Sequence, residues 1–367
     1  MQTIGIATGN LKKNSTGMGT YTFQVIEKIK TEFDVELIKH PDGDSIEGCR
    51  VIDYNRIPGP YWYFSWSKSL ALAKRSWKKC DLFHNIAQYP ISPSISKQYV
   101  VTIYDLIPIL YPSYVTPFYA WQSRIFLPKI LQKASLILSI SQYTKNDIVE
   151  RYQIDPEKIW VTHLGVSDHF HPATQLEIKS LCKRYQLNNP FILFVGAIEP
   201  KKNISSIIRA FHRVRQKNPD IELVIAGKKS WKYQDLFTLI DSLKLNKSIH
   251  FLHFVPYDDL PILYSSASVF VFPSNYEGFG LPPLEAMKCG TPVIVSNKSS
   301  LPEIVGSGGI MVEPEDYEGL AKKIIMILNE ETIRVEQTEY NLARSKDFTW
   351  EQCADKTIKA YQTILDK

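Results

Sequence analysis

The chain has 367 residues, of which 44% are hydrophobic and 22% are charged, and its formal net charge is +5 at pH 7. This length exceeds what one hydrophobic core usually organises, which predicts two domains, and the composition is that of a globular protein and not of a disordered one. The small excess of Lys and Arg does not indicate nucleic-acid binding, for which a clustered basic face is typical.

Cysteine usage and hydropathy exclude further classes. The five cysteines are scattered, odd in number and without metal-ligand spacing, so we expect neither a metal site nor a disulfide framework. No run approaches the roughly 18 consecutive apolar residues of a transmembrane helix. The first residues, MQTIGIATGN, lack the basic start and apolar centre of a signal peptide. We therefore expect a cytoplasmic protein.

The first 170 residues alternate predicted strands and helices, which indicates a parallel sheet covered on both faces. Strands are expected at 2–7, 100–103, 134–140 and 159–161, and helices at 21–29 and after Ser141. Gly17 and Gly19 open the first helix and could receive a phosphate or a substrate sugar at its N-terminus. A plain flexible turn is the alternative at these glycines.

Two further stretches of this half each allow a functional and a purely structural interpretation. Asp42 and Asp44 stand in HPDGDSIEG, a cluster of turn formers, and we interpret them as part of a turn and not as a metal-binding pair. Residues 61–80, YWYFSWSKSLALAKRSWKKC, carry six aromatic and five basic residues and no acid. That composition suits an anionic membrane surface, and equally a helix packed on the domain with solvated lysines.

A second α/β series follows the polar stretch at 167–189. Its expected strands are 191–195, 222–226, 250–254, 269–273 and 291–295, and its expected helices are 204–215 and 231–243. Gly278 and Gly280 open a tight loop after the fourth of these strands. Pro282 and Pro283 fit the first turn of a short helix, and Gly290 fits the residue just past its end. Residues 350–361 have the periodicity of a terminal helix.

Two carboxylates frame this loop, because Glu277 precedes the glycines and Glu285 lies in the short helix. A loop at the carboxyl end of a parallel strand that leads into a helix N-terminus is where open α/β sheets bind anionic ligands. The plain alternative is a helix entry at which Glu285 only favours the positive end of the helix dipole.

A family resemblance is carried by residues 277–294, EGFGLPPLEAMKCGTPVI. This run resembles the donor-site signature of the retaining glycosyltransferases of family 4, and the likeness extends over nearly the whole chain. It implies the GT-B architecture, in which two doubly wound Rossmann-like domains face a central crevice. The implied parts are an acceptor-binding domain at 1–170, a nucleotide-sugar donor-binding domain at 171–347, and a C-terminal helix at 348–367 that packs back on the first domain.

The resemblance also implies residue roles. Glu277 would contact the donor sugar, Glu285 the ribose hydroxyls, and the amides between them the sugar and diphosphate. A second segment, FILFVGAIEPKKNI, is similar to the phosphate-binding segment of the mannosyltransferase-like branch, with Lys202 as the diphosphate lysine; a solvated lysine at a helix start is the alternative. The implied donor-site residues are Gly17, Gly19, Gly196, Lys201, Lys202, Gly227, Val255, Glu277, Gly278, Phe279, Gly280, Leu281 and Glu285. The implied catalytic residues are Glu277, Lys202, Asp105 and Tyr104.

The chain departs from the family pattern at two positions. Asp105 matches the aspartate of a His-Asp pair, but Tyr104 replaces the histidine, and Ala197 stands where many relatives have arginine. We expect Tyr104 to position a sugar hydroxyl, with simple packing as the alternative. Asp105 either takes part in the site or orders its loop.

The implied function is retaining, metal-independent transfer of a hexose to a glycan or a lipid-linked acceptor, in polysaccharide or glycolipid synthesis, without a cofactor. Mannose from GDP-mannose is favoured, and other GDP- or UDP-hexoses come second. A sugar-nucleotide epimerase, a pyridoxal phosphate-dependent phosphorylase and a non-catalytic sugar-nucleotide binding subunit remain as alternatives. A lipid-linked acceptor would place the protein at the inner membrane face, with residues 61–80 as the hypothetical contact.

Overall fold

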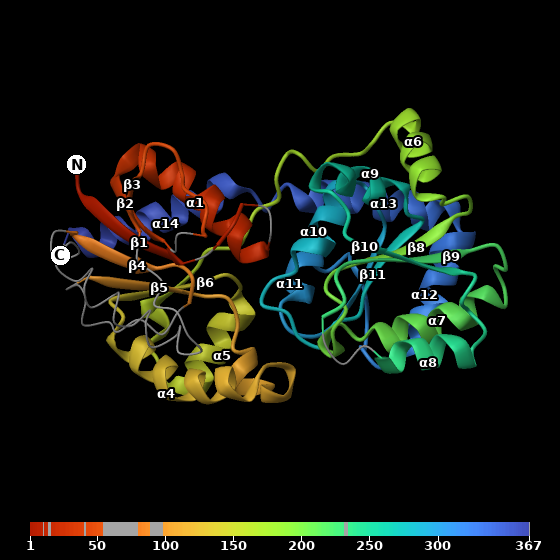
Figure 1. The fold of residues 1–367 in the computed structure, drawn as a ribbon, viewed down its shortest axis with the longest axis horizontal. Coiled ribbons are helices and arrows are strands. Elements are labelled where there is room, and N and C mark those ends of the chain that lie inside the picture. The colour runs from red at the N-terminus through yellow and green to blue at the C-terminus, as the bar shows by residue number, and fades with distance from the viewer. Residues whose placement is uncertain are drawn as a thin grey trace. The chain divides into compact units, whose positions relative to one another are not determined.

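The computed structural model describes residues 1–9, 11–13, 16–39, 42–53, 80–88, 98–230 and 234–366 (Figure 1). They form two compact units, which are Met1–Gly165 with Thr349–Lys367 (unit 1) and Val166–Phe348 (unit 2). Each unit contains one parallel sheet with helices on both sides. The doubly wound α/β class expected from the sequence is confirmed in both units. Of the aromatic and basic stretch at 61–80, all but Cys80 lies outside the described residues, so its membrane hypothesis stays a prediction.

The sheet of unit 1 has seven strands in the order β3-β2-β1-β4-β5-β6-β7. The strands are β1 (Thr3–Gly9), β2 (Asp34–Lys39), β3 (Arg50–Asp53), β4 (Leu82–Asn85), β5 (Tyr99–Ile103), β6 (Leu136–Ser139) and β7 (Ile159–Val161). Every residue of β4, β5 and β6 is buried, as expected for a parallel sheet covered on both faces. The strand order reverses between β1 and β4, where such sheets bind ligands.

Capping side chains set where the helices of unit 1 begin. The helices are α1 (Gly17–Glu32), α3 (Ile107–Leu110), α4 (Pro117–Lys133), α5 (Gln142–Tyr152) and α14 (Trp350–Leu365), with short 3₁₀ turns η2 (Pro112–Tyr114) and η3 (Pro156–Lys158). Thr16, Thr116, Ser141 and Thr349 each accept a backbone N–H at the start of their helix. The first helix thus begins at Gly17 and not at Tyr21, because Thr16 caps it.

Several short elements of unit 1 differ from the sequence expectation. The strands β2, β3 and β4 were not expected, and the strand expected at 134–140 is shortened to β6. Ala134 closes α4, because its N–H bonds to the carbonyl of Ile130. The interpretation of Asp42 and Asp44 as part of a turn is confirmed, and Asp44 Oδ2 accepts the backbone N–H of Lys13 at 2.9 Å.

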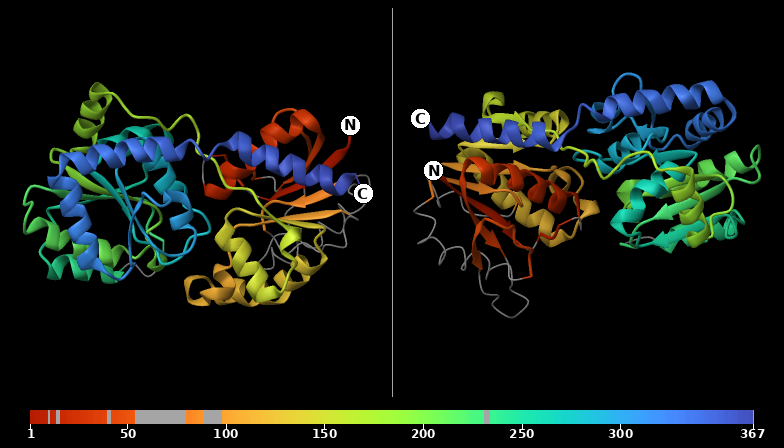
Figure 2. Two further views of the ribbon diagram at one scale, coloured as in Figure 1. Left: turned by 180° about the vertical axis from the view of Figure 1, so that it is seen from behind. Right: turned by 90° about the horizontal axis from the view of Figure 1, so that it is seen from above.

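The terminal helix α14 lies along α1 within unit 1, as both views of Figure 2 show. On the surface, Lys28 Nζ of α1 lies 2.7 Å from Glu351 Oε1 of α14. Inside, the rings of Tyr21 and Trp350 lie 6.5 Å apart between centroids. The chain therefore returns from unit 2 to complete the core of unit 1.

A buried histidine ties α14 to the sheet. Nδ1 of His84, on β4, lies 2.6 Å from the hydroxyl of Tyr361 on α14, and its Nε2 lies 2.8 Å from Thr102 Oγ1 on β5. All three side chains are fully buried. Burial lowers the pKa of His84 to about 3, so its imidazole is neutral at physiological pH.

The sheet of unit 2 has six strands in the order β10-β9-β8-β11-β12-β13. The strands are β8 (Phe191–Val195), β9 (Glu222–Ala226), β10 (Ile249–His253), β11 (Val269–Phe272), β12 (Val293–Ser296) and β13 (Ile310–Val312). Its order reverses between β8 and β11. The loops that follow these two strands therefore meet at the carboxyl edge of the sheet, the usual ligand site of such folds.

The helices of unit 2 cover both sides of this sheet. They are α6 (Gln175–Tyr185), α7 (Ile204–Arg215), α8 (Gln234–Ser242), α9 (Leu260–Ser266), α10 (Leu281–Lys288), α11 (Leu301–Val305), α12 (Tyr317–Asn329) and α13 (Glu331–Ser345), with 3₁₀ turns η4 (Pro200–Lys202) and η5 (Tyr257–Asp259). The strand after α10 begins at Val293 and not at Thr291, because the N–H of Thr291 returns to Ala286 and closes the helix end with Gly290.

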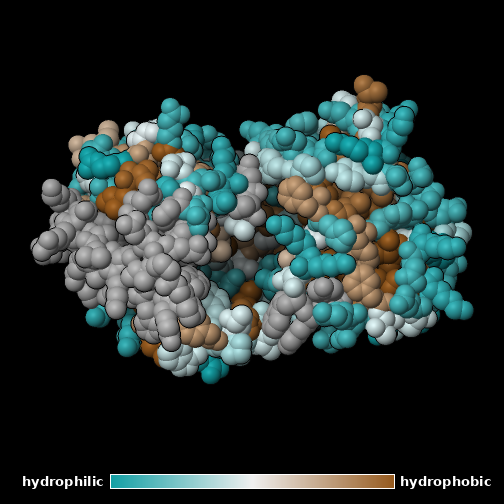
Figure 3. All heavy atoms as spheres, in the orientation of Figure 1, coloured by the Kyte–Doolittle hydropathy of each residue, from teal (hydrophilic) through white to brown (hydrophobic). Residues whose placement is uncertain are grey.

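The surface carries both hydrophilic and apolar residues. On the face shown in Figure 3, hydrophilic side chains alternate with apolar patches over the described residues. Within the described part of the chain, no helix combines the length and the apolar character that a membrane crossing requires.

Replacing His84 by Gln should lower the stability of unit 1 in a pH-dependent way. The pKa of about 3 in the folded protein lies below the ordinary value of 6.5, so the contribution is present above about pH 6.5 and is lost as the pH falls toward 3. The difference in free energy of unfolding between parent and H84Q should therefore shrink by about 2 kcal/mol between pH 7.5 and pH 5. Urea titrations at both pH values measure it, and a difference that does not change with pH would contradict the assignment.

Candidate active site

A buried ion pair joins the two loops at the switch point of unit 2. Lys202 follows β8 and Glu277 follows β11, and the Nζ of the lysine donates to Oε1 of the glutamate at 2.6 Å. The two residues are only 8% and 9% exposed. The structure thus brings together the two residues to which the resemblance assigns the sugar and the diphosphate.

Each member of this pair shapes the protonation of the other. Burial lowers the pKa of the Lys202 ammonium, and the charge of Glu277 opposes that effect. Burial alone would raise the pKa of Glu277, but the charges of Lys202 and Lys201 hold the pKa below its ordinary value. The Lys202 ammonium also lies 4.8 Å from the ring centroid of Phe272, a favourable cation–π distance. Glu277 is therefore ionised at neutral pH, and its negative charge favours the ammonium form of Lys202.

Neutral hydrogen bonds hold the loop that carries Glu277. The backbone N–H of Glu277 donates to Ser299 Oγ at 2.9 Å. The hydroxyl of Ser300 lies 3.0 Å from the Glu277 carbonyl oxygen and 2.5 Å from that of Phe279. On the other side, the N–H of Asn275 donates to the carbonyl of Lys201 at 2.8 Å. The loops after β8, β11 and β12 therefore form one connected support.

Glycines permit close backbone approaches at this edge. Gly280 has φ 136° and leads into α10, and an added Cβ would lie 2.8 Å from Leu301 Cδ2. Gly227, after β9, has φ 153°, and an added Cβ would lie 1.8 Å from the carbonyl oxygen of Gly196. A side chain at Gly227 would collide with the backbone that follows β8.

The second glutamate of the loop has its own buried partner. Glu285, on α10, accepts a hydrogen bond from the hydroxyl of Tyr264 at 2.8 Å, and Tyr264 on α9 is fully buried. Burial raises the pKa of Glu285 to about 7, and the bond from Tyr264 opposes the rise only in part. This carboxyl group therefore changes protonation near neutral pH.

Comparison with known proteins identifies the family. A family model described as Glycosyltransferase Family 4 matches residues 15–170, and one described as Glycosyl transferases group 1 matches residues 183–344. The O-antigen chain mannosyltransferase RfbU of Salmonella typhimurium is 30% identical over 325 residues, which cover 83% of this chain and 85% of the relative. The chain belongs to glycosyltransferase family 4.

A second relative of this family 4 glycosyltransferase is also a mannosyltransferase by name. The O-antigen chain mannosyltransferase B of Escherichia coli is 29% identical over 383 residues, which cover 98% of this chain and 100% of the relative. These similarities confirm the resemblance to the mannosyltransferase-like branch.

Solved structures show the GT-B fold. Sucrose-phosphate synthase from Thermosynechococcus elongatus superimposes with a TM-score of 0.82 at 20% identity, covering 100% of both chains. HepE from Anabaena, in complex with UDP and glucose, superimposes with a TM-score of 0.81 at 18% identity, covering 99% of both chains. At these identities the likeness establishes the fold alone, and the fold is the expected GT-B architecture.

The other predicted donor-site residues of unit 2 also stand at the carboxyl edge of its sheet. Lys201 Nζ lies 3.5 Å from Glu199 Oε1, and the lysine side chain is 20% exposed. Val255 is buried in the loop after β10. Gly278 and Leu281 are partly exposed, whereas the ring of Phe279 is buried against Phe348, with 5.9 Å between centroids. Only the backbone of Phe279 is therefore a candidate for ligand contact.

The predicted glycine pair of unit 1 lies at the start of α1, after β1. Gly17 is exposed, and the N–H of Gly19 donates to the capping oxygen of Thr16 at 3.1 Å. A Cβ at Gly19 would lie 2.2 Å from the carbonyl oxygen of Lys12. The absence of a side chain at Gly19 therefore lets the backbone at Lys12 pass close to the helix. The N–H of Gly19 is already used by the helix cap. Gly17 remains the better candidate for ligand contact.

Tyr104 adopts a packed position that differs from the expected one. Its hydroxyl donates to the carbonyl of Ile86 at 2.8 Å, and its ring stands edge-on to Tyr21 with 5.6 Å between centroids. The residue is only 7% exposed. Because its proton is used within unit 1, this geometry favours packing over the expected role as a hydrogen-bond donor to a sugar.

Asp105 orders the loop that follows β5. Its Oδ1 accepts the backbone N–H of Ile107 at 3.0 Å, which starts the short helix α3. Gln88 holds the same loop, because its Oε1 accepts the N–H of Tyr104 at 3.0 Å and its Nε2 donates to the Asp105 carbonyl at 3.1 Å. The side chain of Asp105 is partly exposed, so ordering the loop does not exclude a place in the site.

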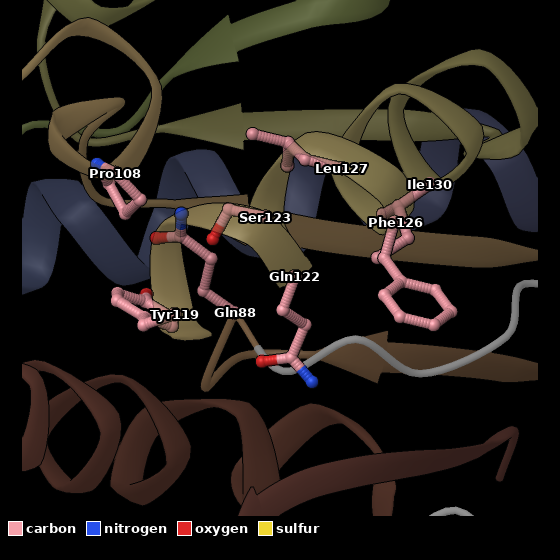
Figure 4. Close-up of a pocket in the computed structure, with 8 residues that line it drawn as sticks. All are labelled: Gln88, Pro108, Tyr119, Gln122, Ser123, Phe126, Leu127 and Ile130. Carbon is pink, nitrogen blue, oxygen red and sulfur yellow. The ribbon is translucent and has the colours of Figure 1, made fainter. Parts of the chain in front are cut away.

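A small cavity lies between this loop and α4 (Figure 4). Its volume is about 30 Å³, enough for one or two water molecules. Ligand pockets usually measure about 300–1,000 Å³, so this cavity does not hold a sugar as it stands. Its lining residues are Gln88, Pro108, Tyr119, Gln122, Ser123, Phe126, Leu127 and Ile130.

Sequence reasoning missed three residues that hold the site. Ser299 and Ser300 follow β12, and their position after a strand of the sheet was the available signal. Tyr264 gave no local signal, because it lies 21 residues from Glu285 in the sequence. Considering only the residues that the structure describes, no group of three or more His, Cys, Asp or Glu side chains is arranged to hold a metal ion.

The pKa of Glu285 makes a prediction about nucleotide-sugar binding. If its carboxylate accepts hydrogen bonds from ribose hydroxyls, as the resemblance implies, binding requires the ionised form. With a pKa of about 7, the ionised fraction and hence the affinity should rise about tenfold between pH 6 and pH 8. Calorimetric titration with GDP-mannose measures this change. The control E285Q should bind more weakly at pH 8 and show no such rise, and a flat profile for the parent would contradict the role.

Proposed function

We propose that this family 4 glycosyltransferase moves a mannosyl residue from GDP-mannose to a glycan or lipid-linked acceptor, with retention at the anomeric carbon and without a metal or cofactor. The observation that carries the proposal is the buried Lys202–Glu277 pair at the switch point of unit 2, 2.6 Å between Nζ and Oε1. Two relatives are named O-antigen chain mannosyltransferases, which supports mannose and a role in polysaccharide synthesis.

In the proposed mechanism, Lys202 stabilises the leaving diphosphate. An ammonium withdrawn from water interacts with developing charge more strongly than an exposed one, and a fixed charge needs no reorganisation during the reaction. Lys201, on the same 3₁₀ turn, adds a second cation near the loop. We infer that these two lysines offset the diphosphate charge in the proposed metal-independent reaction.

Glu277 is suited to hold the sugar and not to move its proton. Its pKa lies below the ordinary value, mainly because Lys202 and Lys201 outweigh the effect of burial, and such a carboxylate is a weak base at neutral pH. It can accept hydrogen bonds from sugar hydroxyls. In the proposed mechanism the leaving diphosphate takes the acceptor proton on the same face of the sugar, while the protein supplies positioning and charge.

A donor panel tests the proposal. A true ligand at about 100 times its dissociation constant stabilises the protein by about 2.7 kcal/mol, so GDP-mannose should raise the melting temperature more than GDP-glucose or UDP-hexoses. NMR of the product formed with an alkyl mannoside acceptor should then show the anomeric configuration of the donor. Inverted product would overturn the retaining mechanism. If another nucleotide sugar raises the melting temperature most, the assignment of mannose is wrong. If the protein converts the donor to an epimer when no acceptor is present, the protein is an epimerase and the proposed transfer is wrong.

Glu277→Gln should lower turnover by about 100-fold at saturating donor, the scale of a lost transition-state contact. GDP affinity should change little, because the nucleotide is assigned to other residues. Loss of the carboxylate also leaves Lys202 buried without its charged partner, so the folded state should lose stability. Turnover is therefore measured below the lowered melting temperature of the variant.

The matched control is Glu318→Gln, which removes the exposed ion pair with Arg213 in the same unit, 3.0 Å between Nε and Oε1. Exposed pairs contribute about 0–1 kcal/mol, so this variant should keep the parent turnover. Parent-like turnover of E277Q would show that the sugar contact is wrongly assigned.

A further inference from the structure

One surface of unit 1 is apolar although it faces solvent. Within the described residues, eleven large hydrophobic side chains are exposed, and six of them fall between residues 111 and 126. We call this surface the α4 face, and it consists of Tyr111, Phe118, Tyr119, Trp121, Ile125 and Phe126. Single exposed apolar residues are ordinary, but such a concentration on one helix and the turn before it marks an interaction site.

The pattern along α4 shows two apolar sides. Leu127, Ile130 and Leu131 are buried and join the core of unit 1. Phe118, Trp121 and Ile125 recur at positions i, i+3 and i+7, which places them on one stripe of the helix, and they are 51%, 54% and 37% exposed. A helix that only covered its own sheet would carry polar residues on that second stripe.

The charged residues near the α4 face indicate an anionic partner. From residue 106 to residue 146 the chain has four basic residues and no Asp or Glu, although its overall content of 38 acids in 367 residues would give about four. Arg124, Lys129 and Lys133, all on α4, are exposed. This surface is therefore complementary to an anionic one.

The side chains match a lipid surface better than a protein. Trp and Tyr are enriched where a membrane meets water, and Lys and Arg beside them interact with anionic headgroups. Protein interfaces share the aromatic residues but are depleted in lysine, which this helix carries at two exposed positions, Lys129 and Lys133. On the face drawn in Figure 3, apolar atoms lie beside hydrophilic ones along the lower edge of unit 1, where α4 runs.

We propose that the α4 face rests on an anionic lipid bilayer, with its aromatic rings at headgroup level and Arg124, Lys129 and Lys133 beside lipid phosphates. The inference rests on the proposed function in one respect, because a lipid-linked acceptor is held at a membrane. It assigns membrane contact to α4 independently of residues 61–80.

Vesicle co-sedimentation without substrates tests the proposal. The parent protein should bind vesicles of phosphatidylcholine with phosphatidylglycerol at low salt, and should bind pure phosphatidylcholine far less. The double variant W121Q/I125Q should weaken partitioning at least tenfold, and R124Q/K129Q should weaken it about 25-fold, since each basic residue near the surface contributes about a fivefold factor. The charge variant should also reduce the salt dependence.

Matched controls come from exposed positions of unit 2. L176Q/V335Q removes exposed apolar side chains, and K179Q/K183Q removes two charges from α6; both should bind like the parent. All these side chains are on the surface, so circular dichroism and melting temperatures should match the parent. α4 variants that bind vesicles as the parent does would overturn the proposal, as would equal loss in the control variants.

Two further measurements separate this inference from the proposed function. Transfer to a short alkyl mannoside in solution should be unchanged in the α4 variants. Transfer without any vesicle binding would overturn the membrane inference alone, whereas vesicle binding without transfer from any donor would overturn the proposed function alone. Light scattering that shows dimers in the parent and monomers in W121Q/I125Q, without vesicle binding, would assign the face to a second copy of the chain and overturn the lipid partner.

Discussion

Unit 2 depends on keeping one ammonium and one carboxylate together away from water. Charges as buried as Lys202 and Glu277 are tolerable only as a pair, since removing one partner of a buried pair costs about 3–5 kcal/mol. The partners are 75 residues apart in the sequence, and the 2.6 Å contact exists because β8 and β11 are neighbours in the sheet. The reversal of strand order between those strands is therefore what makes the site.

The supports of this pair are uncharged. Ser299 and Ser300 hold the backbone of the Glu277 loop, and the N–H of Asn275 bonds to the Lys201 carbonyl. Neutral groups therefore fix the backbone of the loop, while the ion pair fixes the two charged side chains. Glu285 also has an uncharged partner, the hydroxyl of Tyr264. Because no cation offsets the effect of burial, the pKa of its carboxyl group is raised to about 7.

The sequence predicted those features that depend on neighbours along the chain. Strands ending at Val195 and at Pro273, one residue beyond the observed end of β11, follow local patterns, as do the glycine loop and both glutamates, so the edge of the unit 2 sheet could be anticipated. Side-chain partners could not be anticipated where they come from distant segments. Tyr104 follows a correctly expected strand, but the carbonyl of Ile86 and the ring of Tyr21 determine where it points. The α4 face was missed for a related reason, because periodicity alone does not tell which apolar stripe meets the core.

The two units build the same edge of their sheets with different chemistry. In unit 2 the loops after β8 and β11 are joined by an ion pair, whereas in unit 1 the loops after β4 and β5 are joined by neutral bonds of Gln88 to the backbone of Tyr104 and Asp105. A histidine at position 104 would bring a titratable group to that edge; tyrosine stays neutral up to about pH 10. The edge of unit 2 thus offers cations that suit a diphosphate, whereas the edge of unit 1 offers the partly exposed carboxylate of Asp105, which can accept hydrogen bonds from sugar hydroxyls. The replacement of histidine by tyrosine therefore keeps a titratable cation away from this edge, which fits the acceptor-binding role that the family resemblance implies for unit 1.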